Sequence, residues 1–261
     1  MNTAVTVFFL ILRVFSLYFL AVSLFGLCSR RRPEPAARLR RFAVLIAARN
    51  EESCIAGLIE SLRAQHYPPE LVDIWVLPNN CTDRTAEAAR RAGAQVLEMP
   101  ASVRSKGAAL HTAAKALLRS ARNYDAFCVF DADNEADPAF LSEMNRALDR
   151  TAIVKSRILA KNRTQAGISA CYEIYFCSAN HFLNRAREAV GLSARVIGTG
   201  FAIRRDLLEA LDGFPCRTLT EDAELYAACL CRGARIGYCE TAVTYDEEPV
   251  TWRASLVQRR R

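Results

Sequence analysis

The chain has 261 residues, of which 51% are hydrophobic and 24% are charged, a composition that excludes a disordered, collagen-like or small disulfide-stapled protein. Its length favours one sizeable α/β domain. The formal net charge is +7, and most of the excess lies in residues 29–41, where six arginines accompany one glutamate. A nucleic-acid-binding domain more often carries its basic patch on the folded body. The location of the charge therefore favours a membrane flank and argues against nucleic acid as a partner.

An apolar segment begins the chain. Residues 4–28 contain one charged side chain, Arg13. As a helix they would span about 37 Å, enough to cross a bilayer. The run is too long for a signal peptide, and no basic region precedes it. Residues 1–28 are therefore predicted to form a transmembrane helix. Arg13 faces a partner helix or an internal cavity, or else reaches a membrane surface from a tilted helix, and both alternatives stay open.

The arginines after this helix predict its orientation. Arg30, Arg31 and Arg32 belong to a basic juxtamembrane linker over 29–41, and the positive-inside rule then places the domain from residue 42 onward in the cytoplasm, at the inner or plasma membrane. The ten cysteines agree with that compartment, because most lie inside apolar runs and none forms a CxxC pair. They are predicted to be buried free thiols in a reducing environment.

From residue 42, strand and helix patterns alternate. Phe42–Ala48 is a continuous apolar run, typical of a strand buried on both faces, and Glu51–Gln65 has apolar residues at helical spacing. Asp137-Pro138 indicates the N-cap and first residue of a helix that continues to Leu148. Further strands are predicted at 72–77, 94–98, 126–130, 152–160, 194–203 and within 234–246, and further helices at 82–92, 106–121, 165–190 and 220–231. This order predicts an α/β fold with one mostly parallel sheet between two layers of helices.

Polar, oxygen-rich sequences follow three of the predicted strands. Residues 49–52 (RNEE) follow the first, residues 79–83 (NNCTD) the second, and residues 131–134 (DADN) the strand at 126–130. Ligands of open parallel sheets bind outside the C-terminal ends of the strands. The composition therefore predicts a crevice for a nucleotide and a metal. Helix capping uses the same residue types, and that alternative stays open for each cluster.

Asp131 and Asp133 are the sharpest candidates for metal ligands. Two carboxylates two residues apart at a strand end point the same way, and Mg²⁺ or Mn²⁺ binds one or two such groups together with phosphate oxygens. Asp137 is available to cap the next helix, which leaves both aspartates free for a cation. An EF-hand loop is excluded, because its sixth position is Ala136 and not glycine.

Three other short sequences are ambiguous by themselves. Lys106, at the start of a helix, could hold a phosphate or be a solvated surface lysine. Thr218 and Glu221 fit a capping box, and Asp222 either favours the positive end of that helix or acts as a general base. Gly198-Thr199-Gly200 lacks the third glycine of a dinucleotide-binding fingerprint.

Taken together, these residues resemble the family-2 glycosyltransferases, in particular their membrane-embedded polysaccharide-synthase-like members. The resemblance runs over residues 42–261 and rests on the motifs AARNEE, NNCTDRT, SKGAAL, DAD, GTGFAIRR and LTED, in that order. Residues 258–261 (QRRR) resemble the start of the family's Q-x-x-R-W motif, and the chain ends where Trp would follow. The resemblance therefore implies a longer protein with more transmembrane helices.

The resemblance implies a catalytic domain of the GT-A fold, a three-layer α/β/α arrangement, over residues 42–261. It implies a nucleotide-sugar donor, usually UDP-linked, with Mg²⁺ or Mn²⁺ as cofactor and a saccharide or lipid-linked acceptor. Carried over by position, the donor would contact Ala48, Glu51, Asn79, Lys106 and Asp131. Asp131 would lie near both donor and metal, and Asp133 would bind the metal.

The remaining motifs imply the acceptor side of the reaction. Asp222 of the TED motif would be the catalytic base, with Glu221 beside it in the substrate site. Gly198–Phe201, which includes Gly200, would border the acceptor. Gln258 and Arg261 would clamp the diphosphate. The sequence shows one candidate base and no obvious carboxylate nucleophile, so an inverting, direct displacement is expected.

Two departures from the family pattern concern the nucleoside pocket. Asn79 stands where the family commonly has an aspartate that accepts the uracil N3–H bond, and an Asn carbonyl can still accept it. Arg49 stands where a tyrosine is common. Two further functions stay open as alternatives: a membrane-anchored nucleotidyltransferase, and a catalytically silent subunit that binds a nucleotide-sugar.

Overall fold

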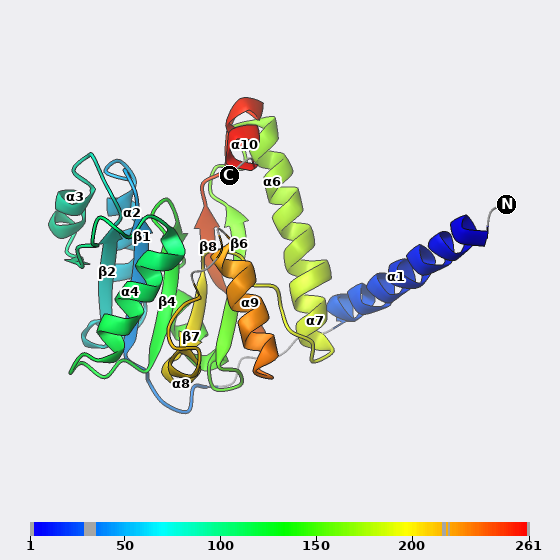
Figure 1. Cartoon of the computed structure of the whole chain (residues 1–261), viewed down its shortest axis with the longest axis horizontal. Coiled ribbons are helices and arrows are strands. Elements are labelled where there is room, and N and C mark those ends of the chain that lie inside the picture. The colour runs from blue at the N-terminus through cyan, green and yellow to red at the C-terminus, as the bar shows by residue number, and fades with distance from the viewer. Residues whose placement is uncertain (1–2, 29–34, 216–217, 219, 260–261) are drawn as a thin grey trace.

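A mixed sheet of eight strands forms the centre of the molecule (Figure 1). The structure is a computed structural model that describes residues 3–28, 35–215, 218 and 220–259. Across the sheet the strands lie in the order β3-β2-β1-β4-β7-β6-β8-β5. Their bounds are β1 Phe42–Ala48, β2 Val72–Pro78, β3 Gln95–Val96, β4 Ala126–Asp131, β5 Glu135–Ala136, β6 Ile153–Ala160, β7 Phe201–Arg204 and β8 Ile236–Asp246.

Most strands of the sheet run in one direction. β3, β2, β1 and β4 are parallel neighbours. β7 is antiparallel to both β4 and β6, and β5 is antiparallel to β8. β6 and β8 are parallel to each other. The five strands β1, β2, β4, β6 and β8 therefore end at the same edge of the sheet, and the turn that precedes β7 returns to that edge.

Helices cover both faces of the sheet. Their bounds are α1 Thr3–Cys28, α2 Ile55–Arg63, α3 Thr85–Arg91, α4 Lys106–Leu118, α5 Phe140–Ala147, α6 Gly167–Ser178, α7 Ala186–Ala189, α8 Arg205–Ala210, α9 Glu221–Cys231 and α10 Trp252–Arg259, with a 3₁₀ turn η1 at Pro69–Leu71 and a π-helical segment η2 at Ala179–Arg185. Alternate β1 side chains face opposite layers, as the strand pleat requires. Val44 packs in the cluster that contains α2 and α5, whereas Leu45 packs in the cluster that contains α4, α8 and α9. The expected α/β/α layering is confirmed.

Several element boundaries differ from the sequence predictions. The helix expected from Asp137 begins at Phe140, because the Asp137 carboxylate accepts the N–H of Ala139 from outside the helix, at 2.9 Å. The helix expected over 165–190 consists of α6, η2 and α7 in succession. β5, α8 and α10 were not predicted. Each of these three is short, with two to eight residues, so it shows too few periods for a sequence pattern to be recognised.

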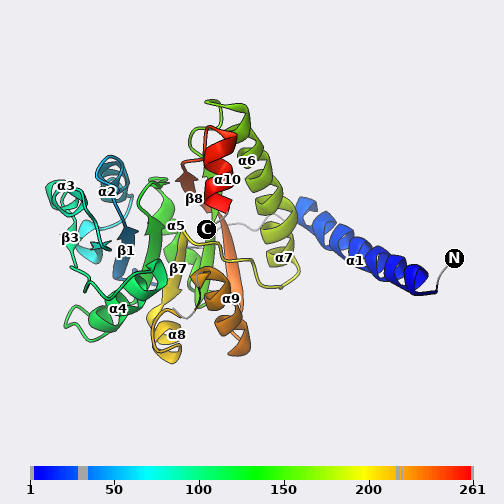
Figure 2. The ribbon, with the colours of Figure 1, turned by 45° about the horizontal axis from the view of Figure 1, so that its top comes forward.

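Helix α1 projects away from the sheet, and α6, η2 and α7 lie between them (Figures 1 and 2). Thr3–Leu27 is long and apolar enough to cross a membrane, and Arg13 on it is exposed. The helix contacts the rest of the chain near its C-terminal end, where the Ser23 hydroxyl donates to the carbonyl of Phe182 at 3.1 Å. A Cβ added to Gly26 would lie 2.8 Å from the His181 carbonyl oxygen, so this close contact depends on glycine. Membrane crossing by α1 stays a prediction.

The α5 side of the core gives a test of the packing. Phe140 is fully buried, and its ring lies 4.9 Å from that of Phe130. Phe140→Ala is expected to lower the free energy of unfolding by about 3–5 kcal/mol, because it leaves a cavity between α5 and the sheet. Urea unfolding of the reduced protein in detergent measures this change. Leu230→Ala, at an exposed site on α9, is the control and should cost below about 1 kcal/mol; equal losses in both variants would contradict the packing assignment.

Candidate active site

Three of the sequence clusters meet at one edge of the sheet. Ala48 pairs in register with Pro78, and Ala47 pairs with Asp131, so β1, β2 and β4 end side by side. The polar residues that follow these strands therefore lie together, as the parallel arrangement predicts. Asp246, the last residue of β8, is at the same edge.

The loops after β1 and β2 are bonded to each other through side chains. The N–H of Glu51 donates to Thr85 Oγ1 at 2.9 Å, and the N–H of Glu52 donates to Asp83 Oδ2 at 3.1 Å. Asp83 also accepts the N–H of Thr85 and so caps α3. Asn50 has φ 60°, a left-handed conformation that asparagine tolerates. The capping alternative thus holds for Asp83, while the carboxylate of Glu51 remains partly exposed at the edge.

Asn79 is held at the centre of this region. It is buried, and its backbone N–H donates to the carbonyl of Ala48 at 2.9 Å. Its side-chain nitrogen donates to the carbonyl of Ser105 at 3.2 Å, and its Oδ1 accepts from Asn80 at 2.8 Å. The two bonds define the orientation of the amide. Oδ1 retains a second lone pair that could accept one further hydrogen bond.

Lys106 joins three elements of the site. It is the first residue of α4, after the N-cap Ser105. Its ammonium group donates to Asp131 Oδ1 at 2.5 Å and to the carbonyl of Gly198 at 2.6 Å, and it lies 3.6 Å from a Glu221 oxygen. Burial disfavours the charged form, but the two carboxylates outweigh it and raise the pKa of Lys106. The alternative of a solvated surface lysine is therefore wrong.

Asp131, Asp133 and Asp246 form a crowded acidic group at this edge of the sheet. Burial and the neighbouring Asp131 raise the pKa of Asp133 to about 6. Burial and Asp133 raise the pKa of Asp246 to about 8. Asn134, which is buried, donates from its amide nitrogen to Asp246 Oδ1 at 2.8 Å. Such crowded carboxylates fit a hard divalent cation, which would neutralise them.

The donor set suits a cation that keeps part of its shell for a substrate. Within the residues that the structure describes, no three His, Cys, Asp or Glu side chains form a complete metal-binding group. Two carboxylates, Asp131 and Asp133, remain as the candidate ligands. Mg²⁺ and Mn²⁺ sites of this type are completed by phosphate oxygens and water.

Asp222 is also brought to this edge. It lies in the first turn of α9, where its Oδ1 accepts the N–H of Ala223 at 2.8 Å and its Oδ2 accepts the N–H of Gly198 at 3.1 Å. The capping box expected from Thr218 and Glu221 is wrong: the Thr218 hydroxyl donates to Thr220 and Glu224. Asp222 thus accepts the backbone N–H of Gly198, and Lys106 donates to the backbone carbonyl of the same residue.

Some expected site residues lie elsewhere or carry no side chain into the site. Gln258 is exposed on α10, in a shallow depression that it shares with Thr251, Arg253, Ala254 and Val257. Arg261 lies outside the described residues. Gly200 is buried at φ +59°, and a Cβ there would lie 2.5 Å from the Ser156 hydroxyl, so only glycine fits this turn. Gly200 therefore shapes the site through the backbone.

Two polar residues at the edge lie inside predicted site segments, Asn134 in residues 131–134 and Thr199 in Gly198–Phe201, but sequence reasoning gave neither a role of its own. Asn134 and Thr199 are buried side by side, and both side-chain oxygens accept the N–H of Asp131, at 3.1 and 3.0 Å. The Thr199 hydroxyl also donates to Asn134. Asn134 is the last residue of DADN, whereas no local signal distinguishes Thr199, since its side-chain partners Asn134 and Asp131 are 65 and 68 positions away.

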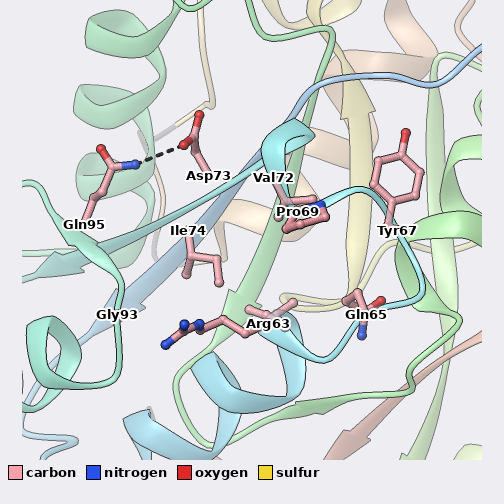
Figure 3. A pocket seen from close by; sticks show the side chains of 10 residues that line it. Arg63, Gln65, Tyr67, Pro69, Val72, Asp73, Ile74, Gly93 and Gln95 are labelled. Carbon is pink, nitrogen blue, oxygen red and sulfur yellow. Dashed lines mark hydrogen bonds between the residues drawn. The ribbon is translucent and has the colours of Figure 1, made fainter.

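A second cavity, of about 300 Å³, lies at the opposite edge of the sheet (Figure 3). It is lined by Val72, Asp73 and Ile74 at the start of β2. Its polar groups already have partners: Asp73 accepts from Gln95 at 3.1 Å, and Arg63 donates to the carbonyl of Ala92 at 3.0 Å. Because these two side chains already have partners within the protein, the edge with Lys106 is the better candidate site.

Comparison with known proteins shows the family of this chain. The family model described as "Glycosyltransferase like family 2" matches residues 40–261. The "Probable glycosyltransferase YdaM" of Bacillus subtilis is 27% identical over 240 residues, which are 87% of this chain and 56% of that protein. The "Beta-monoglucosyldiacylglycerol synthase" of Synechocystis is 26% identical over 228 residues, 83% of this chain and 46% of that protein. The chain spans about half the length of these relatives.

Solved structures show the same fold. A mannosyltransferase from Pyrobaculum calidifontis, in complex with GDP-Man and Mn²⁺, matches with a TM-score of 0.73 at 21% identity, over 94% of this chain and 67% of that one. Glucosyl-3-phosphoglycerate synthase from Mycobacterium tuberculosis, with Mn²⁺, UDP and glucosyl-3-phosphoglycerate, matches with a TM-score of 0.58 at 21% identity, over 88% of this chain and 83% of that one. The expected GT-A-like architecture is thereby confirmed.

Proposed function

Since this chain belongs to the glycosyltransferase-like family 2, we propose that it transfers a sugar from a nucleotide-sugar, with a UDP-sugar as first choice, to a saccharide or lipid-linked acceptor. One observation carries the proposal. The ammonium of Lys106 and the carboxylates of Asp131 and Asp222 converge on Gly198 or its neighbours at the sheet edge. The reaction requires carboxylates that bind a metal ion, a positive group that binds phosphate, and a base. Asp131 with Asp133, Lys106 and Asp222 would supply them in that order.

The donor would lie across the ends of β1, β2 and β4. Ala48, Glu51 and Asn79 would surround the nucleoside, with Asn79 Oδ1 accepting a hydrogen bond from the base. Asp131 and Asp133 would hold Mg²⁺ or Mn²⁺, which when bound stabilises negative charge on the diphosphate. Lys106, 2.5 Å from Asp131, would stay bonded to Gly198 and direct its remaining N–H group to the same diphosphate, which it would stabilise as the leaving group.

Asp222 would act as the general base. Its carboxylate is held by the N–H groups of Gly198 and Ala223, an arrangement that limits its rotation. It would accept the proton of the acceptor hydroxyl as that oxygen attacks the anomeric carbon and the diphosphate leaves. A single displacement of this kind inverts the anomeric configuration.

We place this reaction at the cytoplasmic face of the cell membrane. Helix α1 could anchor the domain, and Arg30, Arg31 and Arg32 of the predicted linker, which lie outside the described residues, would face anionic lipid headgroups. Arg40 does not belong to that basic flank, because it is buried and pairs with Asp149. The relatives named "Beta-monoglucosyldiacylglycerol synthase" support a lipid-linked acceptor. The protein would then take its soluble donor from the cytoplasm and its acceptor from the bilayer.

Calorimetry of nucleotide binding to the full chain in detergent tests the donor class. UDP is expected to bind at least about tenfold more tightly than GDP in Mn²⁺, because Asn79 supplies an acceptor suited to the uracil N3–H. Binding should be lost in EDTA. Incubation with UDP-sugars and diacylglycerol or saccharide acceptors then measures UDP release and product. Preference for GDP would overturn uracil as the nucleobase of the donor but leave the proposed sugar transfer intact. Pyrophosphate release from an NTP would indicate a nucleotidyltransferase. UDP binding without turnover would indicate a silent subunit.

A further inference from the structure

Lys155, in the middle of β6, is a buried charged residue that the proposed reaction does not use. Its side chain is 1% exposed. The ammonium group donates to the carbonyl of Thr199 at 2.6 Å and to that of Gly200 at 3.2 Å. Among the described residues no carboxylate lies within ion-pair distance of it. Burial lowers the pKa of Lys155 to about 7. A lysine buried without an ion pair is energetically unfavourable, so the contacts that hold Lys155 there call for an explanation.

The segment that Lys155 holds is the turn Gly198–Gly200, and the other side of this turn faces the site. The Gly198 carbonyl accepts from Lys106 at 2.6 Å, and the Gly198 N–H donates to Asp222 at 3.1 Å. Thr199 Oγ1 accepts the N–H of Asp131 at 3.0 Å. This turn of three residues therefore contacts Lys106, Asp222 and Asp131, which belong to three different elements.

Lys155 determines which way the peptides of this turn face. The Gly200 carbonyl also accepts the N–H of Ser156 at 2.9 Å, but the Thr199 carbonyl has Lys155 as its described partner. Without the ammonium group, the Thr199 carbonyl would be buried without a hydrogen bond, which favours rotation of the peptide toward water. Rotation there would carry the adjacent Gly198 away from Lys106 and Asp222.

We propose that Lys155 is a positioning residue, which holds the Thr199 and Gly200 carbonyls on the interior side so that Gly198 stays bonded to Asp222 and Lys106. This inference rests on the proposed function. In this role Lys155, which lies behind the site, keeps the base Asp222 aligned with the reacting hydroxyl. A misplacement of about 1 Å can cost about 100-fold in rate, so a side chain that fixes this turn affects the rate without contacting the substrate.

The test compares full-length wild type with Lys155→Met, which fills a similar volume but donates no hydrogen bond. Calorimetry with UDP and Mn²⁺ gives the affinity and the number of sites. UDP release from the UDP-sugar that the wild type uses gives kcat and the donor KM. We expect kcat to fall about 30–100-fold while the donor KM, the UDP affinity and the site number change less than about fivefold.

Two further variants make the result specific. Lys155→Gln keeps a donor for the carbonyls and should recover at least about threefold in kcat over Lys155→Met. Lys115→Met, an exposed lysine of α4 paired with Asp212, should match the wild type. The inference is overturned if kcat of Lys155→Met stays within about threefold of wild type, or if its loss equals the loss of binding sites, since that indicates misfolding. If Lys155→Met does not fold, Lys155→Gln decides by the same two criteria. Absence of UDP binding and turnover in the wild type would instead overturn the proposed function, and this role with it.

Discussion

Asp222→Asn is expected to reduce sugar transfer by about 10²–10⁴-fold, the range for removal of a general base. Asparagine has nearly the same shape, and its single carbonyl oxygen can still accept one of the two N–H bonds that Asp222 receives from Gly198 and Ala223. It cannot accept the proton of the acceptor hydroxyl. UDP binding in Mn²⁺ should persist, because the residues proposed to hold the diphosphate lie on β4 and α4. Transfer assays and calorimetry on the same preparation measure both effects.

The matched control for this substitution is Glu224→Gln. Glu224 lies in the same first turn of α9, but its carboxylate bonds to Thr218 and not to Gly198. Its rate should stay within about threefold of wild type, as expected for a residue that contacts no reacting atom. Transfer by Asp222→Asn at close to the wild-type rate would show that another group takes the proton, and Glu221 would then be the next candidate.

Asp133→Ala is expected to weaken the Mn²⁺-dependent part of UDP binding by at least about tenfold, or 1.4 kcal/mol. The substitution leaves Asp131 as the sole proposed protein ligand of the cation. Titration of UDP with Mn²⁺ and with EDTA separates the metal-dependent part from the rest. Binding in EDTA should be unchanged or slightly improved, because one carboxylate of the crowded group has been removed.

A thermal melt of the metal-free variant supplies a second measurement. Burial and Asp131 raise the pKa of Asp133, which means that its ionised form is unfavourable in the folded protein. Loss of this carboxylate should therefore leave the melting temperature unchanged or higher. Asp212→Ala, in an exposed turn after α8, is the control and should bind UDP as the wild type does. Metal-dependent binding that survives in Asp133→Ala would contradict the role assigned to this residue.

Local pattern was sufficient to predict most of the sheet and where its polar residues gather. The bounds of β1 are those expected from its apolar run, and β2, β4 and β6 differ from their predicted ranges by one residue at one end. These strands are buried on both faces, so hydrophobicity alone marks them. The rule that ligands bind at strand ends then located Glu51, Asn79 and Asp131 at one edge before any contact was known.

Contacts between distant residues decided the rest. Gly198 is 92 positions from Lys106 and 24 from Asp222, and no periodicity relates them. Lys155 reads in the sequence as one polar residue in a strand, and it became a candidate only when its ammonium was seen beneath the turn 44 positions away. The physical reason is that a hydrophobic pattern depends on residues close together in the sequence. The position of a buried polar group depends instead on its hydrogen-bond partner, which can be far away in the sequence. The sequence by itself determined the family and the residues proposed to carry the chemistry, and only the tertiary structure decided which of them touch.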